Sequence, residues 1–239
     1  MRTDGRAVNE LRKISFQPGI VKNATGSVLA VCGNTEVICT ATFTPGVPGW
    51  MKAQGVEGGW LTAEYAMLPA STGDRNRREN KSGPGGRSSE IQRLIGRSLR
   101  SIVDLKKLGE FTVNLDCDVL NADGGTRCTS INGAVAALQL AVQKLMSSGD
   151  LTENPVVKNA GAVSVGIVDG VPMLDLCYVE DSAAEVDMNV VMTSEEEFIE
   201  VQGTAEGMVF KKNELDQMLE LASGGIKEII KIRTQLLDK

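Results

Sequence analysis

The middle of the chain reads Asn121-Ala-Asp-Gly-Gly-Thr-Arg-Cys-Thr-Ser130. This stretch follows an alternating apolar run, Phe111 to Leu120, and precedes a run of helical apolar periodicity, Ile131 to Met146. The order predicts a strand, a glycine turn and a helix. Gly124 and Gly125 allow the backbone to turn tightly and to approach a ligand closely. We therefore expect this strand, turn and helix to lie at the centre of the fold.

The predicted turn has the features of an anion-binding site. Thr126, Thr129 and Ser130 are residues that commonly begin helices, where free N–H groups and the positive end of the helix dipole attract anions. Arg127 adds a guanidinium group whose planar fork of donors matches phosphate. By itself, such a stretch is more often an ordinary strand-to-helix turn with a surface arginine, so both interpretations stand at this point.

A second glycine–arginine stretch, Lys81-Ser-Gly-Pro-Gly-Gly-Arg-Ser-Ser-Glu90, repeats the same design. Gly85 and Gly86 precede Arg87, and two serines open another predicted helix. Two such helix starts facing one ligand would form a phosphate clamp. Neither stretch matches the nucleotide-binding loop G-x-x-x-x-G-K-[ST], and no G-x-G-x-x-G follows a predicted strand. The expected ligand is therefore phosphate itself or a backbone phosphate, not a nucleotide triphosphate tail.

Composition limits the possible chemistry. The chain has 239 residues, of which 42% are hydrophobic and 23% charged, a balance typical of soluble globular proteins. No apolar run approaches the roughly 18 residues of a membrane span, and the polar first residues do not form a secretion signal. The five cysteines form no C-x-x-C pair, which favours buried reduced thiols and a cytoplasmic location. The absence of histidine excludes Ser-His-Asp and Cys-His catalysis and any zinc site that uses imidazole.

Charge is distributed unevenly along the chain. The net charge is −6, but eight basic and three acidic residues lie between positions 70 and 100, so this segment carries +5 and the rest −11. A concentrated positive patch on an acidic body is typical of a selective polyanion binder. The aperiodic segment Ser71 to Gly86, which carries Arg75, Arg77 and Arg78, is predicted to be a mobile loop that orders on a partner.

The helix predicted from Ser89 to Lys107 has an apolar stripe and an opposite stripe of Arg93, Arg97 and Arg100. A solvated charged face is a fair interpretation of such a stripe. The absence of acidic residues from it favours contact with a polyanion or a subunit interface.

The remaining elements indicate an α/β chain. Hairpin turns are predicted at Gly33-Asn34 and Asp169-Gly170. The other predicted strands are Ser27–Cys32, Thr35–Phe43, Trp60–Met67, Ala162–Val168, Val171–Tyr178, a strand through Met192 and Phe198–Gln202; Thr44–Gly59 is predicted as a loop and Asn213–Leu237 as a helix. We expect one domain, residues 1–239, with two weakly similar halves at about 1–110 and 111–239.

The segment Glu180-Asp-Ser-Ala-Ala-Glu-Val-Asp-Met-Asn189 gathers four carboxylates in eight residues. Carboxylate oxygens suit Mg²⁺ or Mn²⁺, which bind through one or two carboxylates together with water and phosphate. A solvated acidic turn is an equally common interpretation of such a run. The small residues between the carboxylates leave room for a ligand and favour the metal site.

These stretches resemble the ribonuclease PH family of bacterial phosphate-dependent exoribonucleases, over essentially the whole chain. The matching stretches are Met1-Arg-Thr-Asp-Gly-Arg6, Gly59-Trp-Leu-Thr-Ala-Glu-Tyr65, Gly86-Arg87, Glu90-Ile-Gln-Arg-Leu-Ile95, Leu115-Asp-Cys-Asp-Val-Leu120, Ala122-Asp-Gly-Gly-Thr-Arg127, Asp181-Ser-Ala-Ala-Glu-Val-Asp-Met-Asn189 and Val201-Gln-Gly-Thr-Ala-Glu206. The resemblance implies a duplicated β-α-β-α fold in two layers, an α/β (α+β) class. It also implies a homohexameric ring built as a trimer of dimers.

The resemblance also implies roles for single residues. Phosphate, the co-substrate, would be bound by Arg87, Gly125, Thr126 and Arg127. The catalytic carboxylates that hold Mg²⁺ or Mn²⁺ would be Asp181 and Asp187. RNA would be bound by Arg75 and Arg78, and we add Arg77 and Arg93 from the charge pattern. Where the family usually has an arginine after Leu68-Pro69, this chain has Ala70, so one RNA contact is either missing or supplied by Arg77.

The activity that the resemblance implies is trimming of the 3′ ends of transfer RNA precursors. Phosphate would attack the last phosphodiester and release nucleoside 5′-diphosphates reversibly, with a carboxylate or a metal-bound water donating the proton. One alternative is a non-catalytic RNA-binding subunit of an exosome-like ring, which the presence of all four charged site residues disfavours. A phosphate-loop NTPase or kinase is disfavoured because no lysine follows either glycine pair.

Overall fold

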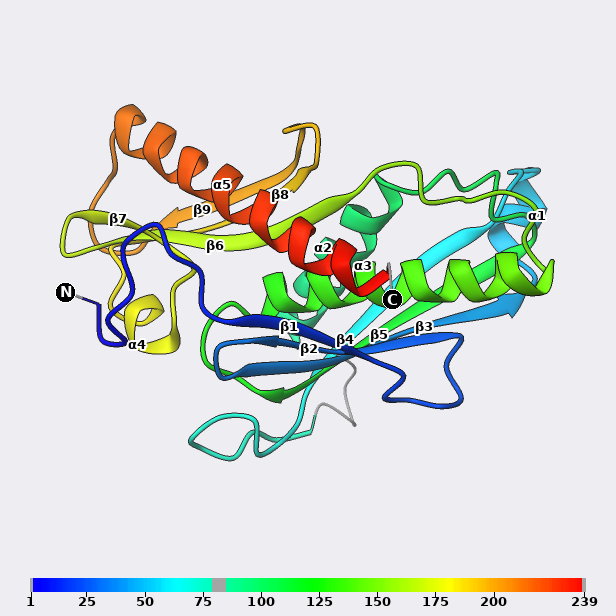
Figure 1. Cartoon of the computed structure of the whole chain (residues 1–239), viewed down its shortest axis with the longest axis horizontal. Helices are drawn as coiled ribbons and strands as arrows, with labels where there is room; N and C mark the ends of the chain where they lie inside the picture. Colours follow the sequence, from blue (N-terminus) through cyan, green and yellow to red (C-terminus); the bar gives the residue numbers. More distant parts are fainter. Residues whose placement is uncertain (1, 79–84, 238–239) are drawn as a thin grey trace.

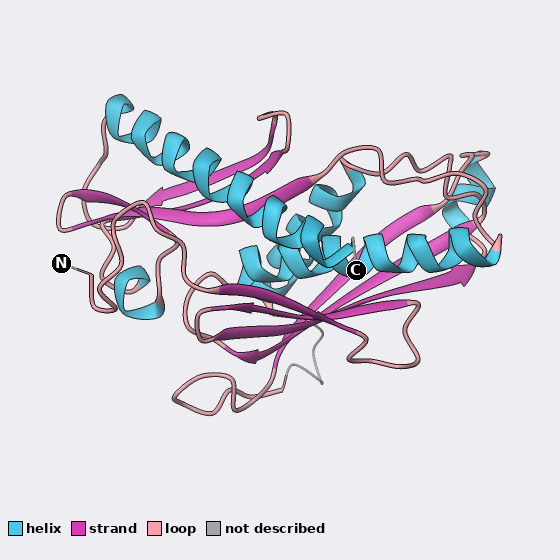
Figure 2. Cartoon of the chain, viewed as in Figure 1, coloured by secondary structure: helices cyan, strands magenta, loops and turns pink. Residues whose placement is uncertain are grey.

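The computed structural model describes residues 2–78 and 85–237. Its elements form two β-sheets with helices packed between and against them (Figure 1, Figure 2). The strands are β1 (Ile14–Pro18), β2 (Gly26–Cys32), β3 (Thr35–Pro45), β4 (Trp60–Met67), β5 (Phe111–Asn121), β6 (Ala160–Val168), β7 (Val171–Leu174), β8 (Val186–Thr193) and β9 (Phe198–Ala205). The helices are α1 (Gly49–Gln54), α2 (Gly86–Arg100), α3 (Thr126–Ser148), α4 (Tyr178–Asp181) and α5 (Lys212–Leu237).

The first sheet has five strands in the order β1-β2-β3-β5-β4. Its strands pair antiparallel except for β4 and β5, which are parallel and are joined through α2. Strand β5 shows why one face of this sheet is covered. Val113, Leu115 and Cys117 are buried in the core, while the alternate residues, among them Asp116 and Asp118, point to the other face. The helices therefore pack on the apolar face of the first sheet, and a groove lies on the opposite, polar face.

Helix α3 lies between the two sheets. It packs against β2 and β3 of the first sheet and against β6 of the second, and Figure 1 shows it running from the middle of the molecule toward the end at which α1 lies. From Thr126 to Val142 nearly all its side chains are buried. A helix that is apolar on all sides needs neighbours on all sides, so α3 is the element that fixes both sheets around the turn preceding it.

The second sheet has four antiparallel strands in the order β7-β6-β8-β9. Helix α5 packs along β6 and β7 and covers a separate apolar core of Val, Leu, Ile and Met side chains. The β6–β7 turn has Asp169 and Gly170 at φ of 51° and 70°, the left-handed pair that a type I′ turn requires. In the described part of the chain, no helix is long and apolar enough to cross a membrane.

The predicted two-layer α/β class is confirmed, and several predicted boundaries are corrected. Helix α3 begins at Thr126, one of the residues predicted to start it, directly after Gly125 in the left-handed conformation. Helix α2 ends at Arg100 and not at Lys107, since the N–H of Asp104 bonds to Pro155 and the chain turns there. The predicted loop 44–59 contains α1, which Gly55 ends at φ 64°.

The acidic segment is also organised differently from the prediction. The second strand of the β6–β7 hairpin stops at Leu174, and a short helix, α4, follows where the strand was expected to continue. Strand β1 was not predicted. The predicted mobile loop falls partly on residues 79–84, which lie outside the described residues; in its first part, Asn76 donates from its backbone to Pro69. The proposed similarity of residues 1–110 and 111–239 stays a prediction, although β5 pairs within the first sheet.

Candidate functional site

The turn before α3 has the conformation that its glycines predicted. Gly124 and Gly125 have φ of 74° and 64°, and a Cβ on Gly124 would lie 2.6 Å from the carbonyl oxygen of Leu176. No side chain caps the helix start. Thr129 and Ser130, predicted as capping residues, lie inside the first turns and donate to the carbonyls of Gly125 and Thr126. The first N–H groups of α3 therefore carry no side-chain cap, as an anion-binding helix start requires.

A buried ion pair supports this turn from below. Arg12 donates to the carboxylate of Asp175 through Nε at 3.0 Å and Nη2 at 2.7 Å, and it also donates to the carbonyls of Asp123 and Gly124. Burial alone would raise the pKa of Asp175, but the hydrogen bonds and charge of Arg12 hold it below its usual value. The carbonyls of Asp123 and Gly124 are thus occupied by Arg12, and the backbone N–H of Asp123 donates to the hydroxyl of Thr35.

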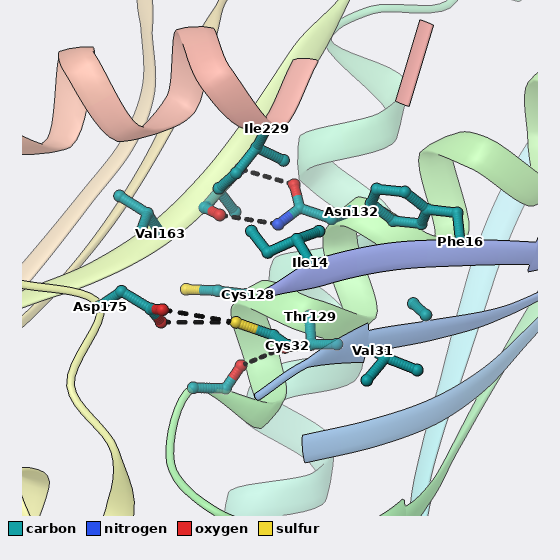
Figure 3. Close-up of a pocket in the computed structure, with 13 residues that line it drawn as sticks. Ile14, Phe16, Val31, Cys32, Cys128, Thr129, Asn132, Val163, Asp175 and Ile229 are labelled. Carbon is teal, nitrogen blue, oxygen red and sulfur yellow. Dashed lines mark hydrogen bonds between the residues drawn. The ribbon is translucent and has the colours of Figure 1, made fainter. Parts of the chain in front are cut away.

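Figure 3 shows a small cavity behind the turn, with Asp175 and Cys32 at one end. The thiol of Cys32 lies 3.5 Å from both carboxylate oxygens of Asp175, and burial raises the pKa of this thiol well above its usual range. The cavity has a volume of about 10 Å³, room for about one water molecule. The cavity is a small packing void among the buried residues that support the turn. All five cysteines are buried free thiols, as predicted.

Arg87 lies at the start of α2, which also begins without a side-chain cap. The charges of Arg87 and Arg127 both act on the two predicted metal ligands, Asp181 at the end of α4 and Asp187 in β8. The predicted phosphate arginines and the predicted carboxylates come from four elements and lie within range of one another's charges. Thr126, next to Arg127, accepts a hydrogen bond from the hydroxyl of Tyr65 at 3.0 Å.

The pKa values of both carboxyl groups are shifted by burial and by neighbouring charges. Burial and, next to it, the charge of Asp181 raise the pKa of Asp187 to about 6, against the lowering effect of Arg127. Burial also raises the pKa of Asp181, against the effect of Arg87 and Arg127. The negative charge of Glu206 acts on both carboxylates in the same direction as burial. Two partly buried carboxylates that repel each other form a site for a cation.

The donor set fits a magnesium-type ion. Within residues 2–78 and 85–237, no three acidic or cysteine side chains come close enough to hold a metal by themselves. A pair of carboxylates is nevertheless what Mg²⁺ commonly takes from a protein, with water and substrate phosphate completing its shell. Asp181 and Asp187 are the residues that would hold it.

The position of Asp181 is set by its neighbour in sequence. Glu180 is buried and receives two hydrogen bonds from Arg2, Nε to Oε1 at 2.8 Å and Nη2 to Oε2 at 2.7 Å. The backbone N–H of Cys177 also donates to Glu180. The N-terminal segment therefore fixes α4 and, with it, Asp181. These supporting residues were missed by sequence reasoning, although the opening Met1-Arg-Thr-Asp-Gly-Arg6 was among the matched motifs.

Two of the predicted RNA-binding arginines, Arg77 and Arg78, line a groove on the uncovered face of the first sheet. The groove has a volume of about 930 Å³ and is lined by Arg77, Arg78 and Arg87 on one side. Its floor is acidic, which sequence reasoning also missed: it contains Glu64, Asp116 and Asp118. Burial and the two neighbouring carboxylates raise the pKa of Asp118. A polyanion in this groove would contact its basic rim and avoid its floor.

The three arginines of the α2 stripe have different partners. Arg93 is exposed, and its Nε donates to the carbonyl of Ser89, so it stays a candidate for RNA contact. Arg97 is paired with Glu200 of β9. Arg100 donates to the carbonyl of Leu61 and lies 5.0 Å from the ring centre of Trp60. The expectation of a continuous arginine face for a polyanion is therefore wrong for Arg97 and Arg100. Arg75 is exposed and lies outside the lining of the groove.

A model of the 3′ exoribonuclease family, domain 1, matches residues 10–143, and a model of domain 2 of that family matches residues 158–225. Solved structures with the same fold include rice (Oryza sativa) Rrp46, at 22% identity and a TM-score of 0.79 over 99% of this chain and 100% of that one.

Two further structures share the fold. An Archaeoglobus fulgidus exosome with RNA bound to the active site matches at 24% identity and a TM-score of 0.79, over 95% of this chain and 91% of that one. An archaeal exosome core matches at 24% identity and a TM-score of 0.75, over 98% and 90%.

Proposed function

The chain belongs to the 3′ exoribonuclease family, and from this premise we propose that it shortens RNA from the 3′ end, with phosphate as the attacking group, as a subunit of an exosome-like ring. The observation that carries the proposal is that the charges of Arg87 and Arg127 act on the carboxylates of Asp181 and Asp187. Two arginines beside two carboxylates suit a reaction in which one phosphate group attacks another while a cation is bound.

Each group has a task in this reaction. Arg127 and the uncapped N–H groups at the start of α3 bind the attacking phosphate, and Arg87 binds it from the start of α2. One oxygen of the bound phosphate forms a bond to the terminal phosphorus of the RNA as the bond to the 3′ oxygen breaks. The products are a nucleoside 5′-diphosphate and an RNA shortened by one residue, whose 3′ oxygen takes up a proton. Because a phosphoanhydride replaces a phosphodiester, the reaction is reversible.

The carboxylates are proposed to hold Mg²⁺ or Mn²⁺. When bound, such an ion neutralises charge that develops on the phosphoryl oxygens. Asp181 and Asp187 supply the negative charge that attracts it, and Arg2 holds α4 so that Asp181 keeps its place. Burial raises the pKa of both carboxyl groups although Arg87 and Arg127 oppose the shift, and a bound cation would further favour their ionised forms.

RNA is proposed to enter along the basic rim of the groove. Arg77 and Arg78 line it next to Arg87, and Arg75 and Arg93 are exposed nearby in sequence. The 3′ ends of transfer RNA precursors are the substrate class that the family resemblance suggests, with Ala70 removing one expected contact. A homohexamer built as a trimer of dimers, in the cytoplasm, is part of the same proposal.

A second candidate function is a ring subunit that binds RNA without cleaving it. It is favoured by the comparisons, because the similar structures include two exosomes and rice Rrp46. It is disfavoured by the site, in which every charged group that phosphorolysis needs is present. The two functions differ in whether phosphate changes the RNA.

The test uses the full chain with an RNA that carries a labelled 5′ end and a single-stranded 3′ extension. With Mg²⁺ and phosphate, the proposal expects a ladder of shorter RNAs, and without phosphate an unchanged band. RNA that is bound in a mobility-shift assay but keeps its length with phosphate present would support the non-catalytic candidate.

A further inference from the structure

The guanidinium group of Arg127 is held by two residues from other parts of the fold. Its Nη1 donates to Oε1 of Gln202 in β9 at 2.9 Å and lies 3.8 Å from Oε2 of Glu90 in α2. Gln202 in turn donates from Nε2 to Oε1 of Glu90 at 3.3 Å. Arg127, Gln202 and Glu90 thus form a closed triangle that joins the starts of two helices to the edge strand of the second sheet.

A second link between the same two elements lies nearby and does not involve Arg127. Nε and Nη2 of Arg97, on α2, donate to the two carboxylate oxygens of Glu200, on β9, at 2.8 and 2.6 Å. Side chains of α2 and β9 are therefore also joined by an ion pair that does not involve Arg127. Because this link exists beside the triangle, Glu90 is free for another role.

We propose that Glu90, held by Gln202, is a positioning residue that fixes the Arg127 guanidinium at the phosphate site and that its negative charge sets the site's affinity for phosphate. This inference rests on the proposed function, since it assigns the affinity of the same site. Among residues 2–78 and 85–237, the Arg127 guanidinium donates a hydrogen bond only through Nη1, and the side chain is 16% exposed. The rest of the fork is left to receive an anion.

The two partners of Arg127 act in different ways. Gln202 is neutral and orients the guanidinium without reducing its charge. Glu90 is an anion within ion-pair distance, so an incoming phosphate competes with it for the same cation. Removing the charge of Glu90 should strengthen phosphate binding, and adding a charge at Gln202 should weaken it. A residue that only maintained the fold would not produce opposite changes from two near-isosteric substitutions.

The experiment measures the binding of inorganic phosphate to the full chain by titration calorimetry, without RNA. Glu90→Gln is expected to lower Kd roughly twofold to fivefold, the range expected of a partly exposed ion pair. Gln202→Glu is expected to raise Kd by a similar factor. Glu200→Gln is the matched control, because it removes a carboxylate from the same α2–β9 contact at Arg97 and should leave Kd unchanged. Melting temperatures of the three variants are compared with that of wild type.

The outcomes separate the inference from the function on which it rests. If wild type does not bind phosphate, the proposed function fails and the inference fails with it. If wild type binds phosphate and Glu90→Gln leaves Kd unchanged or raises it, the inference is wrong and the function stands. A shift in Glu200→Gln as large as that in Glu90→Gln would assign the effect to packing and also overturn the inference. In turnover assays the change should appear in the KM for phosphate and not in kcat.

Discussion

Arg12 and Asp175 lie 163 positions apart in sequence and form a three-point contact in the fold. The backbone N–H, Nε and Nη2 of Arg12 all donate to the carboxylate of Asp175, at 2.8, 3.0 and 2.7 Å. Asp175 has a φ of 53°, and the same guanidinium reaches the carbonyls of the turn before α3. The anion-binding turn is therefore supported by a buried ion pair that joins the N-terminal segment to the second sheet.

Asp175→Asn should destabilise the protein by about 3–5 kcal/mol, because it leaves the buried Arg12 cation without a counter-charge. Asparagine tolerates the positive φ, so backbone strain does not contribute. The wild-type pKa of Asp175 is depressed below the unfolded value of 3.8. The ion pair therefore contributes its full stability above about pH 4, and stability is lost as pH falls below that value. Chemical denaturation between pH 3 and 7 measures this, and the variant should lose less stability on acidification than wild type. Equal acid dependence in both proteins would contradict this role.

Arg127→Ala should abolish phosphate-dependent shortening while RNA binding stays close to wild type. Loss of a charge-assisted contact costs about 1.5–3 kcal/mol in phosphate affinity, or roughly tenfold to 150-fold. Arg127→Lys keeps the charge but not the planar fork and should fall between the two. The measurement is the rate as a function of phosphate concentration, alongside RNA binding at fixed salt. An unchanged phosphate dependence in the alanine variant would remove Arg127 from the site.

Replacement of Arg75, Arg77 and Arg78 by alanine should weaken RNA binding and flatten its salt dependence. Each lost single-strand phosphate contact reduces the log–log slope by roughly 0.7. The control is the double alanine variant of Lys211 and Lys212, which removes exposed positive charge at the start of α5, away from the groove. If the slope is the same in the loop variant and the control, the loop arginines form only a solvated face.

Asp181→Asn and Asp187→Asn should each suppress turnover, because an amide is a poorer ligand than a carboxylate for a hard cation. In the metal-free protein, Asp187→Asn should also raise the free energy of unfolding at neutral pH, by about 1–2 kcal/mol after allowance for solvent screening. The reason is that burial and the charge of Asp181 raise the pKa of Asp187 to about 6, so its ionised form is disfavoured in the fold. Denaturation in the presence of a chelator measures the gain. Normal turnover by either variant at ordinary metal concentration would make that carboxylate only structural.

The central part of the fold could be predicted because its signals are local. Gly124 and Gly125 between an alternating run and a helical run predicted a turn with positive φ, and both residues have it. Strand β4 was predicted at its observed bounds, and its burial alternates along its length as in a strand with one covered face. Helix α4 could not be predicted, since four residues carry no periodicity; it forms where Glu180 accepts hydrogen bonds from Arg2 and from the N–H of Cys177.

The individual residues of the candidate site could be named from the sequence, but their arrangement in space could not. Local patterns and family resemblance named Arg87, Arg127 and the two aspartates, whereas their proximity depends on α3 lying between the sheets. Arg97 shows the opposite failure. A helix face opposite the apolar stripe normally faces solvent, and here Glu200 of β9 reaches that face and pairs with Arg97. Contacts such as that of Arg97 with Glu200, 103 positions away in sequence, leave no local signal.

The identity of the released nucleotide tests the central claim most directly. The full chain is incubated with Mg²⁺ and an RNA bearing a short 3′ extension, with or without phosphate, and the small products are separated by chromatography. The account predicts nucleoside 5′-diphosphates that accumulate only with phosphate, and lengthening of the RNA when excess nucleoside diphosphate is added. Nucleoside monophosphates released in phosphate-free buffer would show that water is the attacking group and would contradict the assignment of Arg87 and Arg127 to phosphate.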